Sequence, residues 1–212
     1  MGLAHFFLRH AGEIGEATLE HVWLTVGAMA LAIAIGVPLG IVAARRPGFS
    51  KAILGGANVA ETIPSLALFG FLLPLPWLGD RADRLAIAAL ALYALLPIIR
   101  NTATGILEID PAVRESAKAM GMTPRQILLQ VELPLSFSTL LAGVRIATVL
   151  TIGIATIAAA VGAGGLGEFI FRGLAMVNNQ LILAGAIPAA LLALGADTIL
   201  GLLERRLRPA GR

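Results

Sequence analysis

The sequence has no cysteine and is poor in charged and aromatic residues. Without cysteine the chain forms no disulfide, no thiolate metal site and no cysteine nucleophile. Only 14% of its 212 residues are charged, against about 25% in an average soluble domain, while 58% are hydrophobic. This composition, with a mean hydropathy of +0.87, is typical of membrane proteins. The length predicts a single transmembrane domain over residues 1–212.

The excess of positive charge does not indicate a nucleic-acid partner. The net charge is +3 and the isoelectric point is near 10.2. However, the sixteen basic residues are spread between apolar segments and form no basic face. Such a distribution fits the excess of lysine and arginine on the cytoplasmic side of membrane proteins. We therefore expect the lipid bilayer, and no nucleic acid, as a partner.

Long apolar segments predict several membrane-spanning helices. A helix needs about 20 apolar residues to cross the hydrocarbon core. Prolines inside the second segment predict a kink there, because proline breaks the helical hydrogen-bond ladder. The sequence thus predicts an all-α, polytopic membrane helix bundle over 20–207, after an outer N-terminal segment, 1–19. The five predicted spans are 22–44, 52–75, 84–107, 134–160 and 178–203.

The basic residues predict the orientation of these spans. Only Arg9, Arg81, Arg84 and Arg172 fall on one side, and Arg145 lies inside a span. This asymmetry predicts an outside N-terminus, and a cytoplasmic C-terminus and 108–133 loop. The eleven basic residues on the cytoplasmic side are Arg45, Arg46, Lys51, Arg100, Arg114, Lys118, Arg125, Arg205, Arg206, Arg208 and Arg212.

A cleaved signal peptide is the alternative for the first span. Such a peptide carries positive charge before an apolar run of about 7–15 residues. Here the apolar run 22–44 is longer, and the basic pair Arg45 and Arg46 follows it. The pattern therefore favours a membrane span.

A polar stretch, 115–134, interrupts the apolar chain and carries strong helix-end signals. Asp110 suits an N-cap position, and Pro111 suits the first helical turn, where a missing N–H costs nothing. Gly121 is placed to end that helix in the left-handed conformation. A first short helix is therefore predicted between Pro111 and Gly121.

A second short helix is predicted directly afterwards. Thr123 and Gln126 match a capping box, in which each side chain binds the other residue's backbone N–H. This helix is expected to run to Val131 or Leu133, with the next span beginning at Pro134. A plain linker between two spans is the alternative. Against it, the small residues Ala117 and Gly121 lie four apart and would let a partner surface approach, flanked by Glu115 and Lys118.

These residues resemble a known family. The pattern Glu-Ser-Ala-x-x-x-Gly-x9-Val-x-Leu-Pro is similar to the EAA loop of ABC-importer permeases, with Ser116 for the usual alanine and Val131 for the usual isoleucine. Segments 61–75, 91–106 and 161–173 are similar to permeases for glycine betaine, choline, carnitine or proline betaine. The resemblance covers about 20–207. The residues that carry the loop pattern are Glu115, Ser116, Ala117, Gly121, Val131, Leu133 and Pro134.

The resemblance implies the membrane subunit of an ATP-driven importer in a bacterial cytoplasmic membrane. An extracytoplasmic binding protein would deliver the solute, and a second permease subunit, identical or not, would complete the pathway. Separate cytoplasmic ATPases would carry ATP and Mg²⁺, so this chain would bind no cofactor and would not be an enzyme. Accordingly, no phosphate-binding G-x-x-x-x-G-K-[ST] run is present. The implied ATPase-docking residues are Glu115, Ser116, Ala117, Lys118, Gly121, Met122, Leu133 and Pro134.

A glycine-rich segment, 162–167, formally matches the dinucleotide pattern G-x-G-x-x-G. That site requires a preceding strand, whereas an apolar helix precedes this segment, so the match does not indicate nucleotide binding. Two interpretations stay open. One is a flexible outside turn, and the other is a docking face for a binding protein. The docking candidates are Gly164, Gly165, Gly167, Glu168 and Arg172.

Three charges fall inside predicted spans, namely Glu61, Arg145 and Asp197. Charges inside a membrane mark functional sites by default and require partners. We expect Arg145 to pair with Asp197 or Glu61 and to hold an inner gate. The alternative is that each charge meets water or lipid headgroups.

Two other functional classes compete with an importer subunit. A stand-alone secondary transporter or channel is the first, although such proteins often contain inverted repeats and none is visible here. A membrane enzyme is the second. The histidines His5, His10 and His21 cluster near the N-terminus and do not predict a metal site, and no nucleophile–histidine–carboxylate arrangement is evident.

Overall fold

The computed structural model describes residues 3–207, and every regular element in that range is helical. Residues 1–2 of the expected outer segment, and Arg208 and Arg212 of the basic count, lie outside the described residues. The elements are α1 (Leu3–Arg9), α2 (Ala11–Arg45), α3 (Pro47–Thr62), α4 (Ser65–Leu72), α5 (Pro76–Gly79), α6 (Ala82–Leu107), α7 (Pro111–Ala119), α8 (Pro124–Gln126), the π-helix η1 (Ile127–Glu132), α9 (Leu133–Ala155), the 3-10 helix η2 (Thr156–Val161), α10 (Gly167–Ala175) and α11 (Asn179–Arg206).

The bundle contains four to five candidate membrane spans. Four helices are long and apolar enough to cross a membrane: α2, α6, the run Pro124–Val161 and α11. The bent pair α3–α4 makes a fifth when it is counted as one span. The predicted all-α membrane bundle of about five spans is therefore confirmed.

Helix α6 forms the centre of the bundle, between α2 and α9. Its Ala86, Ala89, Leu90 and Ile98 are fully buried. Small residues let the neighbouring backbones approach: a Cβ on Gly40 of α2 would lie 2.5 Å from the Thr102 Cβ atom. Close contact through small residues is the usual way in which helices pack inside a membrane.

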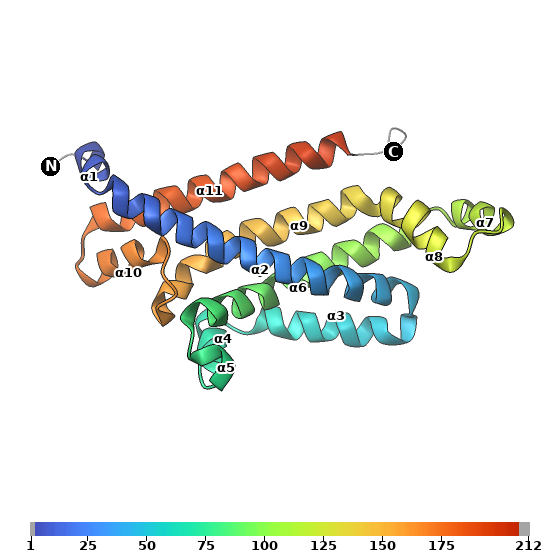
Figure 1. Ribbon diagram of the computed structural model, residues 1–212, viewed down its shortest axis with the longest axis horizontal. Helices are drawn as coiled ribbons and strands as arrows, with labels where there is room; N and C mark the ends of the chain where they lie inside the picture. Colours follow the sequence, from blue (N-terminus) through green and yellow to red (C-terminus); the bar gives the residue numbers. More distant parts are fainter. Residues whose placement is uncertain (1–2, 208–212) are drawn as a thin grey trace.

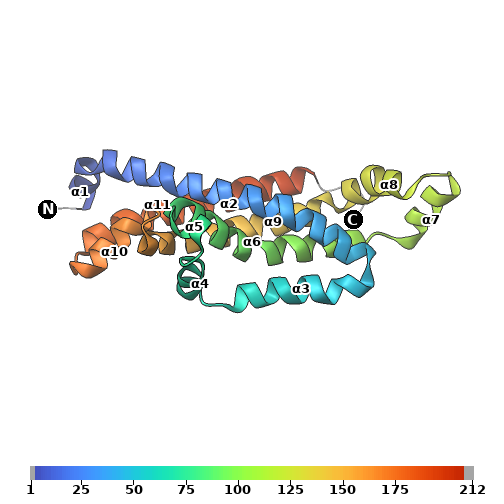
Figure 2. The same ribbon diagram turned by 60° about the horizontal axis from the view of Figure 1, so that its bottom comes forward.

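The two ends of the elongated bundle differ in character. Helix α7 and the C-terminal end of α11 lie towards one end, and α1 and α10 lie at the other (Figures 1 and 2). The polar loop expected over 108–133 therefore lies at the opposite end from the N-terminal helix. This arrangement agrees with an odd number of crossings.

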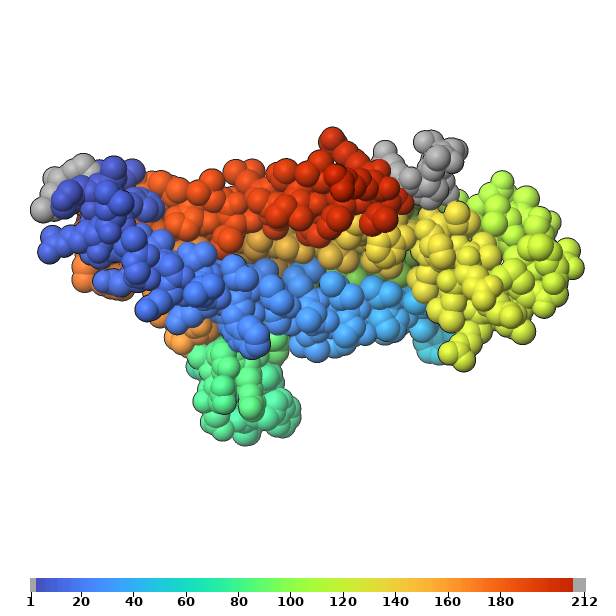
Figure 3. All heavy atoms as spheres, turned by 45° about the horizontal axis from the view of Figure 1, so that its top comes forward, coloured from blue at the N-terminus to red at the C-terminus, as the bar shows by residue number. Residues whose placement is uncertain are grey.

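The second predicted span, 52–75, differs most from expectation. Instead of one kinked helix, α3 and α4 are separated at Ile63 and Pro64 and meet at 101°. Proline has no N–H and pushes the preceding residue into an extended conformation, which Ile63 adopts with φ −68° and ψ 129°. As a result, α4 and α5 project from the side of the bundle (Figure 3).

The second loop helix passes directly into the next span. The chain from Pro124 to Val161 forms one continuous helical run, and its π-helical part ends at Glu132, close to the expected boundary at Pro134. The π-helix η1 allows this continuity, since the Leu133 N–H binds the carbonyl of Leu128, five residues back. In an α-helix the Pro134 ring would collide with the preceding turn, and the wider π turn accommodates it.

Candidate functional site

The end-of-bundle loop is built on locally determined helix caps. The Asp110 carboxylate accepts the Ala112 N–H at 2.8 Å and starts α7. At the other end Gly121 has φ +80°. The Met122 N–H binds the Ala117 carbonyl at 3.2 Å, and the Gly121 N–H binds the Lys118 carbonyl at 2.9 Å. These two bonds form a Schellman motif, the helix end predicted from Gly121.

The capping box at the start of α8 is present as predicted. The Gln126 side chain accepts the Thr123 N–H at 2.8 Å, and the Gln126 N–H binds the Thr123 hydroxyl at 3.4 Å. This box fixes the direction in which the chain leaves α7 and enters the long helix.

The surface of the loop differs in part from expectation. Glu115, Ser116, Lys118, Gly121 and Pro134 are exposed, and Met122 and Leu133 are partly buried. Ala117 is only 2% exposed, so it cannot form the small-residue contact surface that its spacing with Gly121 suggested.

Met120, an apolar residue, is exposed at the tip of the loop in place of Ala117. Met120 is 74% exposed directly before Gly121, and Val113 is 38% exposed on the same helix. Met120 and Val113 therefore add apolar side chains to the exposed surface of this loop. The sequence carried one signal for Met120, namely its position beside the helix-ending glycine.

A buried carboxylate anchors α7 to the bundle. Glu132, at the end of η1, has a side chain that is 5% exposed. Its two oxygens bind two different arginines: Arg45 at 2.7 Å and Arg114 at 2.9 Å. Arg45 ends α2, and Arg114 lies in α7. One carboxylate therefore connects three helical segments.

The arginines extend this connection to further backbone groups. Arg45 also donates to the Pro124 carbonyl at 3.1 Å. Arg114 donates to the carbonyls of Ile109, at 3.1 Å, and Ile106, at the end of α6. Because a buried charge that loses its partners is costly, this Glu132 cluster (Arg45, Arg114 and Glu132) should move as one unit. Sequence reasoning missed it.

The charges inside the spans are only partly brought together. Arg145 of α9 binds the Asp197 carboxylate through Nε at 2.6 Å and Nη2 at 3.1 Å, and Glu204 at 3.3 Å. The pair Arg145–Asp197 is thus present, with Glu204 as an unforeseen third member. Glu61 forms no ion pair with Arg145, and it lies beside the α3–α4 break.

Substitutions at this triad are expected to differ in severity. Arg145→Ala leaves two carboxylates without a partner, whereas Asp197→Asn leaves Arg145 paired with Glu204. Transport should therefore fall several-fold more with Arg145→Ala. The exchange Arg145→Asp with Asp197→Arg should restore part of the loss in reconstituted vesicles. No restoration at all would show that the contact between the two residues is unimportant.

The glycine-rich segment is packed against the start of α2. Gly162, Gly164 and Gly165 have φ between +78° and +83°. The Gly165 N–H donates to the Glu20 carboxylate at 2.9 Å. Gly164, Gly165 and Gly167 are all buried, so they are not available as direct contacts for a binding protein.

Two polar side chains of this segment remain exposed. Glu168 and Arg172 lie on α10, at the end of the bundle opposite α7. The Arg172 guanidinium lies 5.9 Å from the Phe169 ring centroid. Of the docking candidates from the sequence, these two can face a partner.

The packing of this segment predicts a difference between two glycine substitutions. Both Gly162→Ala and Gly164→Ala force a side chain into a left-handed conformation, at about 1–2 kcal/mol. A Cβ at position 162 meets open space, whereas one on Gly164 would lie 2.5 Å from Glu20 Oε2 and would displace this carboxylate from the Gly165 N–H. Thermal unfolding of the purified protein should show a clearly lower Tm for Gly164→Ala. Equal shifts would contradict the contact with Glu20.

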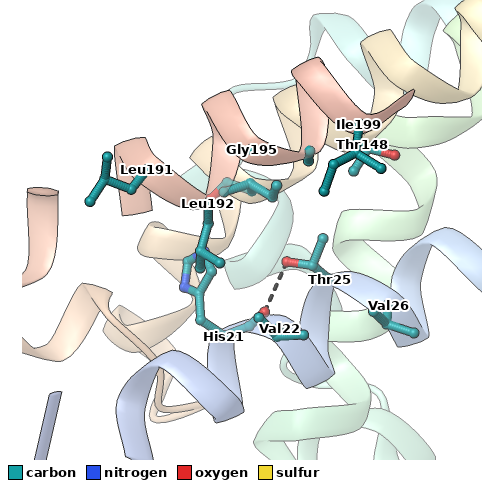
Figure 4. Close-up of a pocket in the computed structure, with 11 residues that line it drawn as sticks. His21, Val22, Thr25, Val26, Thr148, Leu191, Leu192, Gly195 and Ile199 are labelled. Carbon is teal, nitrogen blue, oxygen red and sulfur yellow. Dashed lines mark hydrogen bonds between the residues drawn. The ribbon is translucent and has the colours of Figure 1, made fainter. Parts of the chain in front are cut away.

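A hollow of about 310 Å³ lies between α2, α9 and α11 (Figure 4). Its walls are mostly aliphatic. The Thr25 hydroxyl donates to the His21 carbonyl at 2.9 Å. The Thr148 hydroxyl donates to the Val144 carbonyl at 2.8 Å. His21 Nε2 lies 3.0 Å from the Ile152 carbonyl oxygen. Both hydroxyls are used within their own helices, and among the described residues that line the hollow His21 is the only titratable one, so no carboxylate is present for a cationic solute.

These features define a class of protein. Four long apolar helices, one bent helix pair and a capped polar loop at one end form the architecture of a multi-pass membrane bundle. The chain belongs to the family described as binding-protein-dependent transport system inner membrane component, whose family model matches residues 36–209. It is therefore a permease subunit rather than a stand-alone transporter.

Several relatives match nearly the whole chain. The carnitine transport permease protein OpuCB of Listeria monocytogenes is 43% identical over 96% of this chain and 92% of the relative. The glycine betaine/carnitine/choline transport system permease protein OpuCD of Bacillus subtilis is 45% identical over 98% and 90%. The osmoprotectant import permease protein OsmW of Salmonella typhimurium is 40% identical over 100% and 99%.

Solved structures agree with the fold. A chain of the MetNI methionine ABC transporter in an inward-facing conformation has a TM-score of 0.82 and 23% identity, covering 92% of this chain and 95% of that one. A chain of an amino acid ABC transporter has a TM-score of 0.76 and 17% identity, over 94% and 96%. The helical bundle of this chain is thus the fold of ABC transporter membrane subunits.

Proposed function

We propose that this chain is the permease subunit of an ATP-driven importer for quaternary-ammonium osmoprotectants such as glycine betaine, choline or carnitine. The observation that carries this proposal is 40–45% identity, over nearly the full length, to permeases named for these solutes.

A separate ATP-binding subunit is proposed to dock on α7 and its flanks. The exposed residues Glu115, Lys118, Met120 and Gly121 supply charged and apolar contacts on a helix that is capped at both ends. The Glu132 cluster would pass movement of α7 to α2 and α6, because it binds all three. ATP and Mg²⁺ would reside on the partner.

The docking proposal implies an orientation of the bundle in the membrane. The end of the bundle with α7 would face the cytoplasm, and the N-terminus would lie outside, in agreement with the positive-inside rule. Glu168 and Arg172 would then lie on the outer face, where a solute-binding protein would dock. The Arg145–Asp197–Glu204 triad would hold the middle of α9 against the inner half of α11 as part of a gate.

A second permease subunit is proposed to cover the projecting α4–α5 unit. Leu66, Phe71, Leu73 and Trp77 are between 52% and 70% exposed there. Exposed apolar groups on a segment that projects sideways can pack on lipid or on a second subunit (Figure 3). Five spans alone enclose little space for a pathway, which favours the second subunit.

Uptake by the reconstituted complex tests the proposed substrate class. The permease, its ATPase and its binding protein would be placed in vesicles, with radiolabelled choline as the transported probe. We expect ATP-dependent uptake that unlabelled glycine betaine or carnitine reduces and unlabelled methionine does not. Uptake of methionine but of no quaternary-ammonium solute would overturn the proposal.

A further inference from the structure

The break between α3 and α4 exposes polar groups inside a membrane span. The two helices meet at 101°, and the residues between them, Ile63 and Pro64, are extended. The chain leaves its helical hydrogen-bond ladder there, and one freed acceptor, the Ile63 carbonyl, binds the Tyr93 hydroxyl from α6. Non-helical backbone at membrane depth is tolerated where it is held by protein or lines a cavity.

A cleft of about 310 Å³ opens beside this break. A volume of this size lies at the lower end of the range for small-molecule sites, about 300–1,000 Å³. The lining combines a carboxylate, hydroxyl groups, one aromatic ring and aliphatic side chains. These residues are Glu61, Thr62, Ser65, Tyr93, Leu150 and Ile154, together with the two at the break.

The Glu61 carboxylate has no positive partner within the described part of the chain. It is exposed to the cleft region and forms no ion pair or hydrogen bond with residues 3–207. By contrast, the positive charge of Arg145 is paired with Asp197 and Glu204. Since an unpaired charge inside a membrane is costly, the described part of the chain leaves room at Glu61 for a positively charged group.

The chemistry of the cleft suits a quaternary ammonium group. Such a group has no N–H to donate, so it is held by negative charge and by contact with aromatic and aliphatic surfaces. Glu61 supplies the charge, and Tyr93, Leu150 and Ile154 supply the surfaces. The hollow of similar volume near His21 has no carboxylate in its lining, so it lacks the first of these two elements.

We infer that the cleft at the α3–α4 break is a binding site for the cationic head of the transported solute, with Glu61 as its counter-charge. This inference rests on the proposed function, because it assigns the solute of the importer to particular residues. It makes the permease itself, and not only a binding protein, selective for solutes that carry a quaternary ammonium head.

Charge removal at the cleft is the first test. In the reconstituted complex, Glu61→Gln should lower ATP-driven choline uptake about tenfold, while ATP hydrolysis in the presence of the loaded binding protein stays within about twofold. Glu61→Asp should retain more uptake. Glu16→Gln, which removes an exposed carboxylate of α2 far from the cleft, is the matched control and should transport normally.

Thiol labelling provides a second, direct measurement, because the chain has no cysteine. Ser65→Cys would place one thiol in the cleft. A methanethiosulfonate reagent with a trimethylammonium group should react with it faster when Glu61 is present than in the Glu61→Gln background. Millimolar choline should slow the reaction, whereas a neutral reagent should react equally in both backgrounds.

The outcomes separate this inference from the proposed function. If the unmodified complex transports choline and Glu61→Gln transports it equally well, the cleft assignment is wrong and the proposed function stands. If no quaternary-ammonium solute is transported at all, the proposed function fails. If Glu61→Gln separates two permease subunits and choline does not slow the labelling, Glu61 pairs with the second subunit and the inference is overturned.

Discussion

Glu132→Ala should abolish coupled transport. The Glu132 side chain is 5% exposed and is the shared partner of Arg45 and Arg114. Without Glu132, the partly exposed Arg45 and Arg114 lose the carboxylate that they share and keep only their backbone acceptors. In this chain the loss releases α7 from α2. We therefore expect a fall in ATP-driven uptake of about a hundredfold.

The single arginine substitutions distinguish loss of the α7 anchor from a general loss of protein stability. Arg45→Ala and Arg114→Ala each leave Glu132 with one partner, so each should reduce uptake less than Glu132→Ala does. Glu132→Gln keeps an acceptor oxygen, so its uptake should lie between that of the single arginine variants and that of Glu132→Ala. Glu13→Ala, an exposed carboxylate near the start of α2, is the neutral control. Normal uptake by Glu132→Ala would rule out a coupling role for the cluster.

Gly121→Asp should prevent association with the ATPase subunit. Gly121 has φ +80°, and a Cβ there would meet no atom within 4 Å. An alanine therefore adds only the strain of the left-handed conformation, about 1–2 kcal/mol. An aspartate adds negative charge beside the exposed Met120. Co-purification of the permease with its ATPase measures the effect.

The order of the variants at Gly121 identifies the cause. Gly121→Asn should retain most of the association, because asparagine tolerates the left-handed conformation. Gly121→Ala should weaken it moderately, and Gly121→Asp most. Gly162→Asp, at another left-handed glycine where a Cβ meets open space, is the matched control outside this loop. Undiminished ATPase binding by Gly121→Asp would exclude this loop as the docking site.

Local signals allowed much of the fold to be predicted. The spans follow from apolar length, and the ends of α7 follow from Asp110 and Gly121, whose capping bonds join residues close in sequence. The kink at Pro64 was predictable, but not its size. A bend of 101° depends on how α4 packs and on Tyr93 from α6, neither of which is a local property.

The parts of the site that the sequence did not predict depend on distant contacts. Glu132 binds Arg45 across 87 positions of sequence, and no spacing rule connects them. Ala117 is small enough to let a partner surface approach, yet its side chain is buried. The glycines after η2 read as a flexible turn or a docking face, but Glu20, from the first span, holds them inside.

Solute accumulation with and without the ATPase tests the central claim most directly. Vesicles containing this chain alone would be compared with vesicles containing the chain, its ATPase and its binding protein, with labelled choline outside. The account predicts uptake only in the complete system, only with ATP, and not with Gly121→Asp. Accumulation of choline by the lone chain without ATP would contradict it.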